Sequence, residues 1–238
     1  MTNEILEVQN IHTYVSGYHI LQGLSFKVKK EGITTILGRN GVGKTTLLKT
    51  IIGILKPTRG KIIFKNLNIT GLPPHKIINM GIAFVAAERA IFSGLTVEEN
   101  LNIAFNGKKE EYDSRLQKIF EIFPDLKRLK KLKARNLSGG QQKMLAIACG
   151  FIKEPELMML DEPSEGLSPV FVKVVMETIE KLREEGTTIL LVEQNFNAVR
   201  KIAEFCYFMD KGQIIYQSEI EEIDKNPDIL KKYLGVSI

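Results

Sequence analysis

The chain has 238 residues, of which 44% are hydrophobic and 26% are charged. This balance is typical of a folded globular protein and excludes an intrinsically disordered chain. At about 150 residues per domain, we expect one large domain or two closely joined ones. The formal net charge of +5 permits attraction to phosphates, nucleic acid or anionic lipid, but it selects none of them.

Neither a membrane span nor a signal peptide is evident in the sequence. No apolar run approaches the roughly 18 residues that a spanning helix needs, and the N-terminus lacks a basic region followed by an apolar one. We therefore expect a cytoplasmic protein that does not cross the membrane by itself.

The first ninety residues predict strands on either side of one helix. Residues 5–28 alternate apolar and polar side chains between glycines, a pattern typical of antiparallel strands. A β-branched run at 33–37 leads through a glycine-rich turn to apolar residues at helical spacing between Leu47 and Leu55. Segments 56–69 and 82–85 predict further strands.

The middle of the chain is charged and helical in pattern. Residues 97–135 contain an apolar helical face, and Pro124 is expected to end one helix. Ser138 is a suitable N-cap for the helix that follows. We interpret the basic run 127–133 as a solvated helical face, because it lacks the aromatic residues typical of nucleic-acid binding. No nucleic-acid partner is expected.

Buried parallel strands are predicted in the last third. Residues 157–160 and 188–192 are continuous apolar runs separated by a helical segment near 170–182. The predicted fold class is α/β, with a mostly parallel sheet core, an antiparallel β part and a helical subdomain. We predict a single domain over 1–238, with 1–90 and 156–238 forming the core and 91–155 the helical subdomain.

A phosphate-binding loop follows the strand at 33–37. Its residues fit the pattern G-x-x-x-x-G-K-[ST] between a strand and a helix, a context that an ordinary glycine-rich turn does not explain. Backbone N–H groups and the helix N-terminus would face the phosphates, the lysine would reach the β- and γ-phosphates, and a threonine hydroxyl would face Mg²⁺. The residues predicted to bind the nucleotide here are Gly38, Arg39, Asn40, Gly41, Val42, Gly43, Lys44, Thr45 and Thr46.

Two carboxylates follow the apolar run 157–160, at the strand end where open α/β sheets bind ligands. Asp161 suits Mg²⁺, together with Thr45, and Glu162 suits a base that positions or deprotonates the attacking water. The alternative interpretation is a surface acidic pair, which the phosphate loop in the same chain disfavours.

A second glycine-rich helix start has no role in a generic P-loop enzyme. It consists of Leu137, Ser138, Gly139, Gly140 and Gln141. A capped helix accounts for the serine but not for the combination, which resembles the signature motif of ATP-binding cassette (ABC) proteins. The resemblance implies a P-loop NTPase fold of the ABC type. It also implies that two cassettes enclose two ATP molecules, the signature of one meeting the γ-phosphate bound by the other.

The resemblance extends over the whole chain. The segments "AIFSGLTVEENL", "SEGLSP", "LLVEQN" and "YLG" are similar to the second ATPase subunit of branched-chain amino acid importers. This implies an ATP-hydrolysing importer subunit for branched-chain amino acids or a related small polar solute, with ATP and Mg²⁺ as cofactors. The implied partners are a second cassette, identical or related, and permease subunits at the inner face of the membrane, with a substrate-binding protein involved indirectly.

Individual residues follow or depart from the family pattern. Tyr14 stands about where the family has an aromatic residue that stacks on adenine, and Tyr18 is its competitor. Gln194 occupies the catalytic switch position, where most cassettes have histidine, and its amide can still donate a hydrogen bond to the γ-phosphate. Ala87 replaces the family's Gln or Glu, so either Glu88 takes over its contact to Mg²⁺ and water or that contact is missing.

Three other kinds of protein are less consistent with the sequence. A soluble cassette acting on ribosomes or DNA predicts two cassettes in one chain or a long coiled-coil insertion, and the sequence has neither. A P-loop kinase or GTPase leaves 137–142 unexplained, and no guanine-reading N-K-x-D segment is found. A non-hydrolysing regulatory cassette would more naturally lack Glu162.

Overall fold

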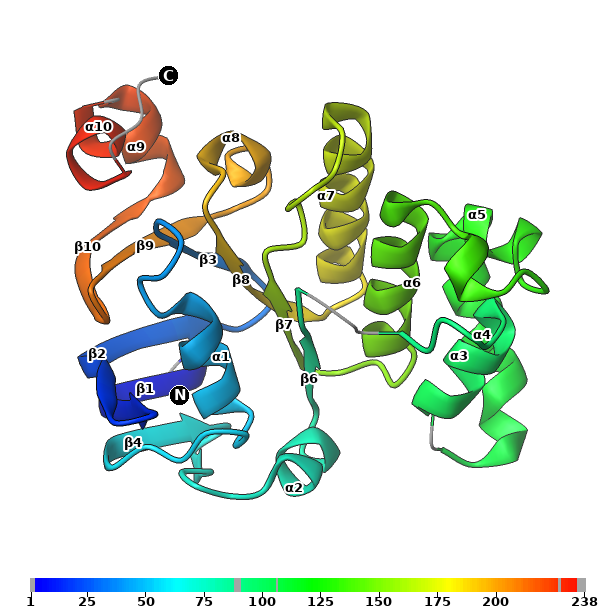
Figure 1. Ribbon diagram of the computed structural model, residues 1–238, viewed down its shortest axis with the longest axis horizontal. Helices are drawn as coiled ribbons and strands as arrows, with labels where there is room; N and C mark the ends of the chain where they lie inside the picture. Colours follow the sequence, from blue (N-terminus) through cyan, green and yellow to red (C-terminus); the bar gives the residue numbers. More distant parts are fainter. Residues whose placement is uncertain (1–2, 88–90, 106, 227, 235–238) are drawn as a thin grey trace.

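A computed structural model describes residues 3–87, 91–105, 107–226 and 228–234, and two sheets organise these residues (Figure 1). The smaller sheet is antiparallel, in the order β2-β1-β4-β5. Its strands are β1 (Glu4–Val15), β2 (Tyr18–Lys29), β4 (Arg59–Phe64) and β5 (Leu67–Asn68). The antiparallel strands predicted from residues 5–28 are confirmed.

The larger sheet has the order β10-β9-β3-β8-β7-β6 and is parallel from β9 to β6. Its strands are β3 (Ile33–Leu37), β6 (Ile82–Val85), β7 (Leu157–Asp161), β8 (Thr188–Glu193), β9 (Phe205–Asp210) and β10 (Gln213–Glu219), the last pairing antiparallel to β9. Every residue of β3, β7 and β8 is buried. The continuous apolar runs therefore became buried parallel strands, as predicted.

The helices form two groups, one packed around the two sheets and one gathered beyond the β6 edge of the larger sheet. Those around the core are α1 (Lys44–Ile51), α2 (Pro74–Asn79), α7 (Pro169–Glu184), α8 (Phe196–Val199), α9 (Ile220–Lys225) and α10 (Asp228–Leu234). Those gathered beyond β6 in Figure 1 are α3 (Val97–Phe105), α4 (Lys109–Ile122), α5 (Pro124–Arg128) and α6 (Gly139–Phe151), with a 3₁₀ turn at Ala134–Asn136. The predicted helix end near Pro124 is confirmed, since α4 stops at Ile122. Among the described helices, none is long and apolar enough to cross a membrane.

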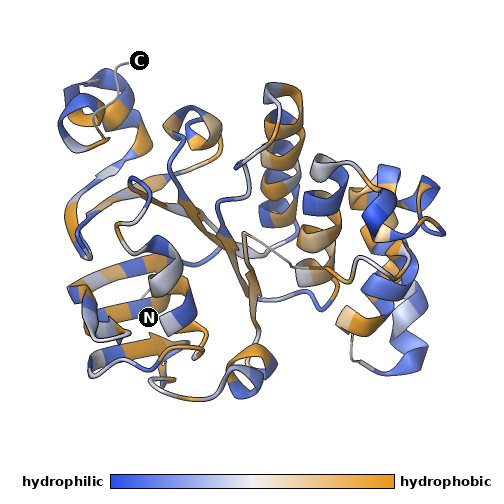
Figure 2. Ribbon diagram, in the orientation of Figure 1, coloured by the Kyte–Doolittle hydropathy of each residue, from blue (hydrophilic) through white to orange (hydrophobic). Residues whose placement is uncertain are grey.

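The strands of the larger sheet contribute to two apolar cores, one on each face. Met158 and Leu160 of β7 join the cluster that includes α6 and α7, whereas Leu157 and Met159 join the cluster beneath α1 and the antiparallel sheet. This alternation follows from the two-residue period of a strand. Figure 2 shows the central strands β7 and β8 as nearly continuous apolar ribbons. Burying each such side chain contributes about 1.5–3 kcal/mol, so the position of β7 is fixed from both faces.

Candidate nucleotide-binding site

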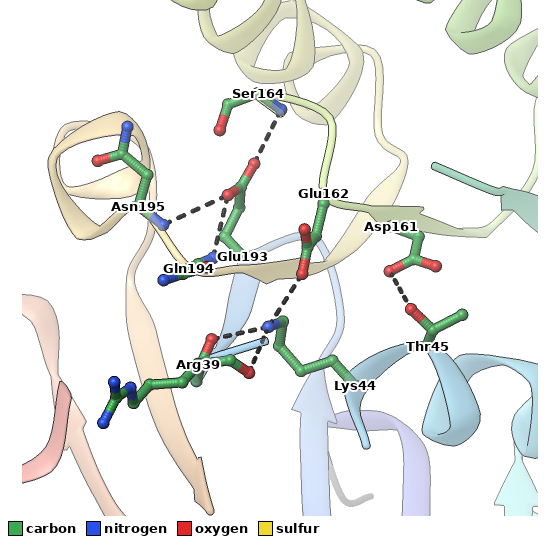
Figure 3. Close-up of polar contacts among 10 residues, drawn as sticks. Arg39, Lys44, Thr45, Asp161, Glu162, Ser164, Glu193, Gln194 and Asn195 are labelled. Atoms are coloured by element: carbon green, nitrogen blue, oxygen red, sulfur yellow. Dashed lines mark hydrogen bonds and ion pairs between the residues drawn. The ribbon is translucent and has the colours of Figure 1, made fainter. Parts of the chain in front are cut away.

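The carboxyl ends of β3, β7 and β8 meet at one edge of the larger sheet. β8 lies between the other two strands, with Leu37 opposite Glu193 and Asp161 opposite Val192. The phosphate-binding loop leaves β3 here, and the paired carboxylates leave β7. The sheet therefore joins segments that are more than a hundred residues apart in sequence, and Figure 3 shows their polar contacts.

Lys44 is held by the loop that precedes it. Its ammonium donates hydrogen bonds to the carbonyls of Gly38 at 2.7 Å and Arg39 at 3.0 Å, and it lies 2.9 Å from Glu162 Oε1. Gly43 has a φ of 110°, in the left-handed region that glycine adopts without steric cost. The loop's path thus depends on its glycine and brings the predicted phosphate-binding lysine to the predicted base.

Thr45 and Asp161 lie together as predicted. The Thr45 hydroxyl donates to Asp161 Oδ1 at 3.1 Å, and Oδ2 is buried with no hydrogen-bond partner among the described residues. Burial raises the pKa of Asp161, opposed by the hydrogen bond from Thr45. Because Mg²⁺ prefers oxygen ligands, this hydroxyl and this unpartnered carboxylate oxygen fit its chemistry.

Glu162 has an unusual backbone conformation. Its φ is 44°, in the left-handed region, which costs a residue with a side chain about 1–2 kcal/mol. The Glu162 N–H donates to the carbonyl of Val192 at 3.0 Å, and its carbonyl accepts from the Glu165 N–H at 3.2 Å and from Lys143 Nζ at 3.4 Å. These contacts hold the backbone in a conformation that directs the carboxylate to Lys44.

Glu193, at the end of β8, is a polar residue of the site that the sequence analysis did not assign. It is 2% exposed, and its carboxylate accepts hydrogen bonds from the N–H groups of Ser164, Gln194 and Asn195 at 2.9, 3.1 and 3.5 Å. Burial raises its pKa, opposed by the hydrogen bonds from Ser164. The sequence feature that could have identified Glu193 is a carboxylate at the end of a continuous apolar run. Glu193 therefore joins the loop after β7 to the backbone of Gln194 and Asn195, which follow β8.

Gln194 is exposed at the rim of the site. Together with Asn40, Glu162 and Ser164 it lines a pocket of about 430 Å³ at the carboxyl edge of the sheet. The structure therefore brings the switch glutamine, a residue of the phosphate-binding loop and the predicted base to one cavity.

The signature segment begins α6. The Gln141 N–H donates to Ser138 Oγ at 3.3 Å and the Ser138 N–H donates to Gln141 Oε1 at 3.0 Å, which confirms the predicted cap. A Cβ at Gly140 would collide with the ring of Phe171, so this glycine lets α6 approach α7 closely. In the described part of the chain, no hydrogen bond or ion pair joins residues 137–141 to the phosphate-binding loop.

The two candidate tyrosines lie on opposite faces of the β1–β2 hairpin. Thr13 is buried and accepts a hydrogen bond from α1, so its side of the hairpin faces that helix. Tyr14, the next residue, points the other way and stacks on His19 with ring centroids 4.3 Å apart. Tyr18 is the cross-strand partner of Val15 and lies on the Thr13 side, 75% exposed. The structure thus places Tyr18, rather than Tyr14, on the face toward the helix that starts at the phosphate-binding loop.

The substitution after β6 is described only in part. Glu88 lies outside the described residues, so neither alternative, that Glu88 takes over the contact or that the contact is missing, is tested. The carbonyl of Ala87 accepts a hydrogen bond from Lys143 Nζ at 3.2 Å. The sequence analysis did not single out Lys143, a polar residue on the helix that the signature begins.

Comparison with known sequences identifies close relatives. Residues 21–165, more than half of the chain, match the ABC transporter family. Over 232 residues, 97% of this chain and 100% of the relative, the chain is 39% identical to the high-affinity branched-chain amino acid transport ATP-binding protein BraG of Pseudomonas aeruginosa. It is 38% identical over 220 residues, 92% of this chain and 93% of the relative, to the probable branched-chain amino acid transport ATP-binding protein LivF of Archaeoglobus fulgidus.

Solved structures give the same assignment. The ADP conformation of an ATP-binding cassette of an ABC transporter matches with a TM-score of 0.88 at 31% identity, over 99% of this chain and 100% of that one. A dimeric post-hydrolysis cassette bound to ADP and Pi matches with a TM-score of 0.79 at 25% identity, over 90% of this chain and 98% of that one. The predicted α/β P-loop NTPase fold of the ABC type is confirmed. The chain belongs to the ABC transporter family and is one of its ATP-binding cassettes, an ATPase.

Proposed function

We propose that this ATPase powers the import of branched-chain amino acids or a related small polar solute through a membrane permease. The transport roles of its relatives support this proposal, because the alignments span nearly the whole of each chain. All the relatives described above that are named for a process are transport proteins, so they lend no support to a cassette acting outside transport. The observation that carries the hydrolytic part is the convergence of Lys44, Asp161 and Glu162 at one edge of the sheet.

In the proposed reaction, the β- and γ-phosphates of ATP lie over the phosphate-binding loop, and Lys44 transfers its ion pair from Glu162 to them. Glu162 then positions a water molecule and accepts its proton as the water oxygen attacks the γ-phosphorus. The bond from the γ-phosphorus to the bridging oxygen breaks, which releases ADP and phosphate. Gln194 donates its amide N–H to a γ-phosphate oxygen. Mg²⁺, held by Thr45 and Asp161, would neutralise charge on the phosphate oxygens.

The proposal includes a second cassette and membrane subunits. The exposed signature residues Ser138 and Gly139 are available to the nucleotide of a second cassette, identical or related, because no described polar contact joins them to the phosphate-binding loop of their own chain. The dimeric cassette with ADP and Pi supports this arrangement. Permease subunits would hold the pair at the inner face of the cell membrane, and a substrate-binding protein would deliver the solute.

The role of Glu162 is tested by Glu162→Gln. This variant is expected to bind ATP but to hydrolyse it about 10²- to 10⁴-fold more slowly, because the amide cannot accept the proton of the attacking water. Phosphate release and ATP titration measure the two properties separately. Glu177→Gln, on the exposed face of α7, is the matched control. Near-normal hydrolysis by Glu162→Gln would refute the assignment.

The metal assignment is tested by Asp161→Asn. Since burial raises the pKa of Asp161 in the folded state, its ionised form destabilises the fold above that pKa, and the penalty fades as the pH falls. The variant should therefore unfold at a higher temperature than the original protein at neutral pH, and this difference should fade in acid. Hydrolysis in Mg²⁺ should fall at least about 10-fold. Thermal unfolding and hydrolysis against free Mg²⁺ check both, and unchanged Mg²⁺ dependence would contradict the assignment.

The hairpin geometry supports Tyr18 as the residue that stacks on the base, in place of Tyr14. Stacking on an aromatic ring contributes about 1–3 kcal/mol per base, so Tyr18→Ala should weaken ATP binding by roughly 5- to 150-fold. Tyr14→Ala, which removes the partner of His19 on the other face, is the matched control and should change affinity much less. Calorimetric titration of ATP measures the affinity of each variant. A larger loss of affinity in Tyr14→Ala than in Tyr18→Ala would assign the stacking role to Tyr14.

The dimer is tested by Ser138→Arg. A bulky cation at the start of α6 should obstruct a partner's nucleotide, so ATP-dependent dimerisation and hydrolysis should fall while the monomer's ATP affinity is kept. Sedimentation in the Glu162→Gln background and ATP titration of the monomer separate these effects. If affinity is lost together with activity, Ser138 serves its own subunit's site instead.

A further inference from the structure

Lys143 belongs to α6, but its ammonium reaches two segments of the nucleotide-binding core. It donates hydrogen bonds to the carbonyl of Ala87, just after β6, at 3.2 Å and to the carbonyl of Glu162, just after β7, at 3.4 Å. The same helix begins with the signature residues. One side chain therefore joins the signature helix to the ends of two strands of the parallel sheet.

The ammonium of Lys143 is partly buried and lies near several carboxylates, but its hydrogen-bond partners are backbone carbonyls. Burial lowers its pKa, and the nearby carboxylates of Glu165, Glu193, Asp161 and Glu162 oppose that shift by favouring the charged form. In the part of the chain that the structure describes, none of these carboxylates comes within ion-pair distance of it, and Glu162 turns its carboxylate to Lys44 instead. A partly buried ammonium is costly without polar partners, and here backbone carbonyls supply them.

The two residues whose carbonyls bind Lys143 each have an unusual feature. Ala87 has a methyl side chain, so its backbone is the only polar group it can offer. Glu162 has a left-handed backbone with a φ of 44°, a conformation that persists only where the surroundings enforce it. A cation beside its carbonyl oxygen, in addition to the Glu165 N–H, stabilises the peptide orientation on which the carboxylate's direction depends.

We infer that Lys143 is a positioning residue for ATP hydrolysis, which holds the backbone of Glu162 so that its carboxylate faces Lys44 and the attacking water. The inference rests on the proposed role of Glu162 as the base. Lys143 makes no described hydrogen bond or ion pair with the phosphate-binding loop, so its removal should affect turnover rather than nucleotide binding. A displacement of the base by about 1 Å is enough to slow a reaction by roughly 100-fold.

The first test is the kinetics of Lys143→Met in the intact chain. We expect kcat for ATP hydrolysis to fall about 10- to 100-fold, with KM and the melting temperature nearly unchanged. Lys143→Arg should recover most of the lost rate, because a guanidinium can donate to both carbonyls. Lys153→Met, an exposed lysine just after α6, is the matched control and should behave as the original protein. If Lys143→Met does not fold, Lys143→Gln replaces it with the same expectation.

The second test separates positioning from a general structural role. In single-turnover measurements, Lys143→Met should cause no further loss in a Glu162→Gln background, because a residue that acts through Glu162 has nothing left to position. Three results would overturn the inference while leaving Glu162 as the base. The rate losses of Lys143→Met and Glu162→Gln could multiply in the double variant, Lys143→Met could raise KM alone, or Lys143→Met and Lys143→Gln could turn over normally. Near-normal hydrolysis by Glu162→Gln alone would instead show that the proposed base is wrong, and the inference would fall with it.

Discussion

Lys44 and Glu162 face each other at 2.9 Å, although the lysine is only 4% exposed. A buried ion pair is favourable only if its remaining hydrogen-bonding capacity is satisfied. The carbonyls of Gly38 and Arg39 meet that condition for the ammonium. The contact requires three features at once: the glycine-dependent path of the loop, the register of β7 against β8, and the left-handed backbone of Glu162. These features lie in two segments, the loop after β3 and the end of β7, which β8 holds side by side, so the pair depends on the pairing of these three strands.

The same edge of the sheet contains two acids whose ionised forms disfavour folding. Burial raises the pKa values of Asp161 and Glu193, and they differ in how the structure satisfies them. Glu193 accepts three backbone N–H groups and serves the architecture, whereas one oxygen of Asp161 has no partner among the described residues. The apolar cores on both faces of β7 compensate for such local costs. An unsatisfied group in an otherwise satisfied site is characteristic of a ligand position.

The fold and the position of the glycine-rich loop between β3 and α1 were predictable because their signals are local. Buried parallel strands appear as apolar runs, and the loop motif is contiguous in sequence. The roles of Glu193 and Lys143 were not predictable, because each depends on contacts with residues distant in sequence. The choice between Tyr14 and Tyr18 depends on which face of a hairpin each occupies, and the pairing of β1 and β2 shifts register between Thr13 and Tyr14. Such a shift leaves no mark in a sequence pattern.

In the proposed dimer, α6 serves two nucleotide sites. Its first turn, capped by Ser138, faces the nucleotide of the partner cassette, and Lys143 contacts the backbone of Glu162 in its own site. The two residues are five positions apart, about 7.5 Å along a helix axis, so they move as one rigid unit. A partner nucleotide that pulls the helix N-terminus therefore also moves the ammonium relative to the Glu162 carbonyl. If the partner's nucleotide shifts the conformation of Glu162 in this way, the coupling is reciprocal, and the conformation of Glu162 would in turn affect how tightly the signature holds that nucleotide. In the proposed dimer, α6 would thereby link hydrolysis at one site to closure of the other.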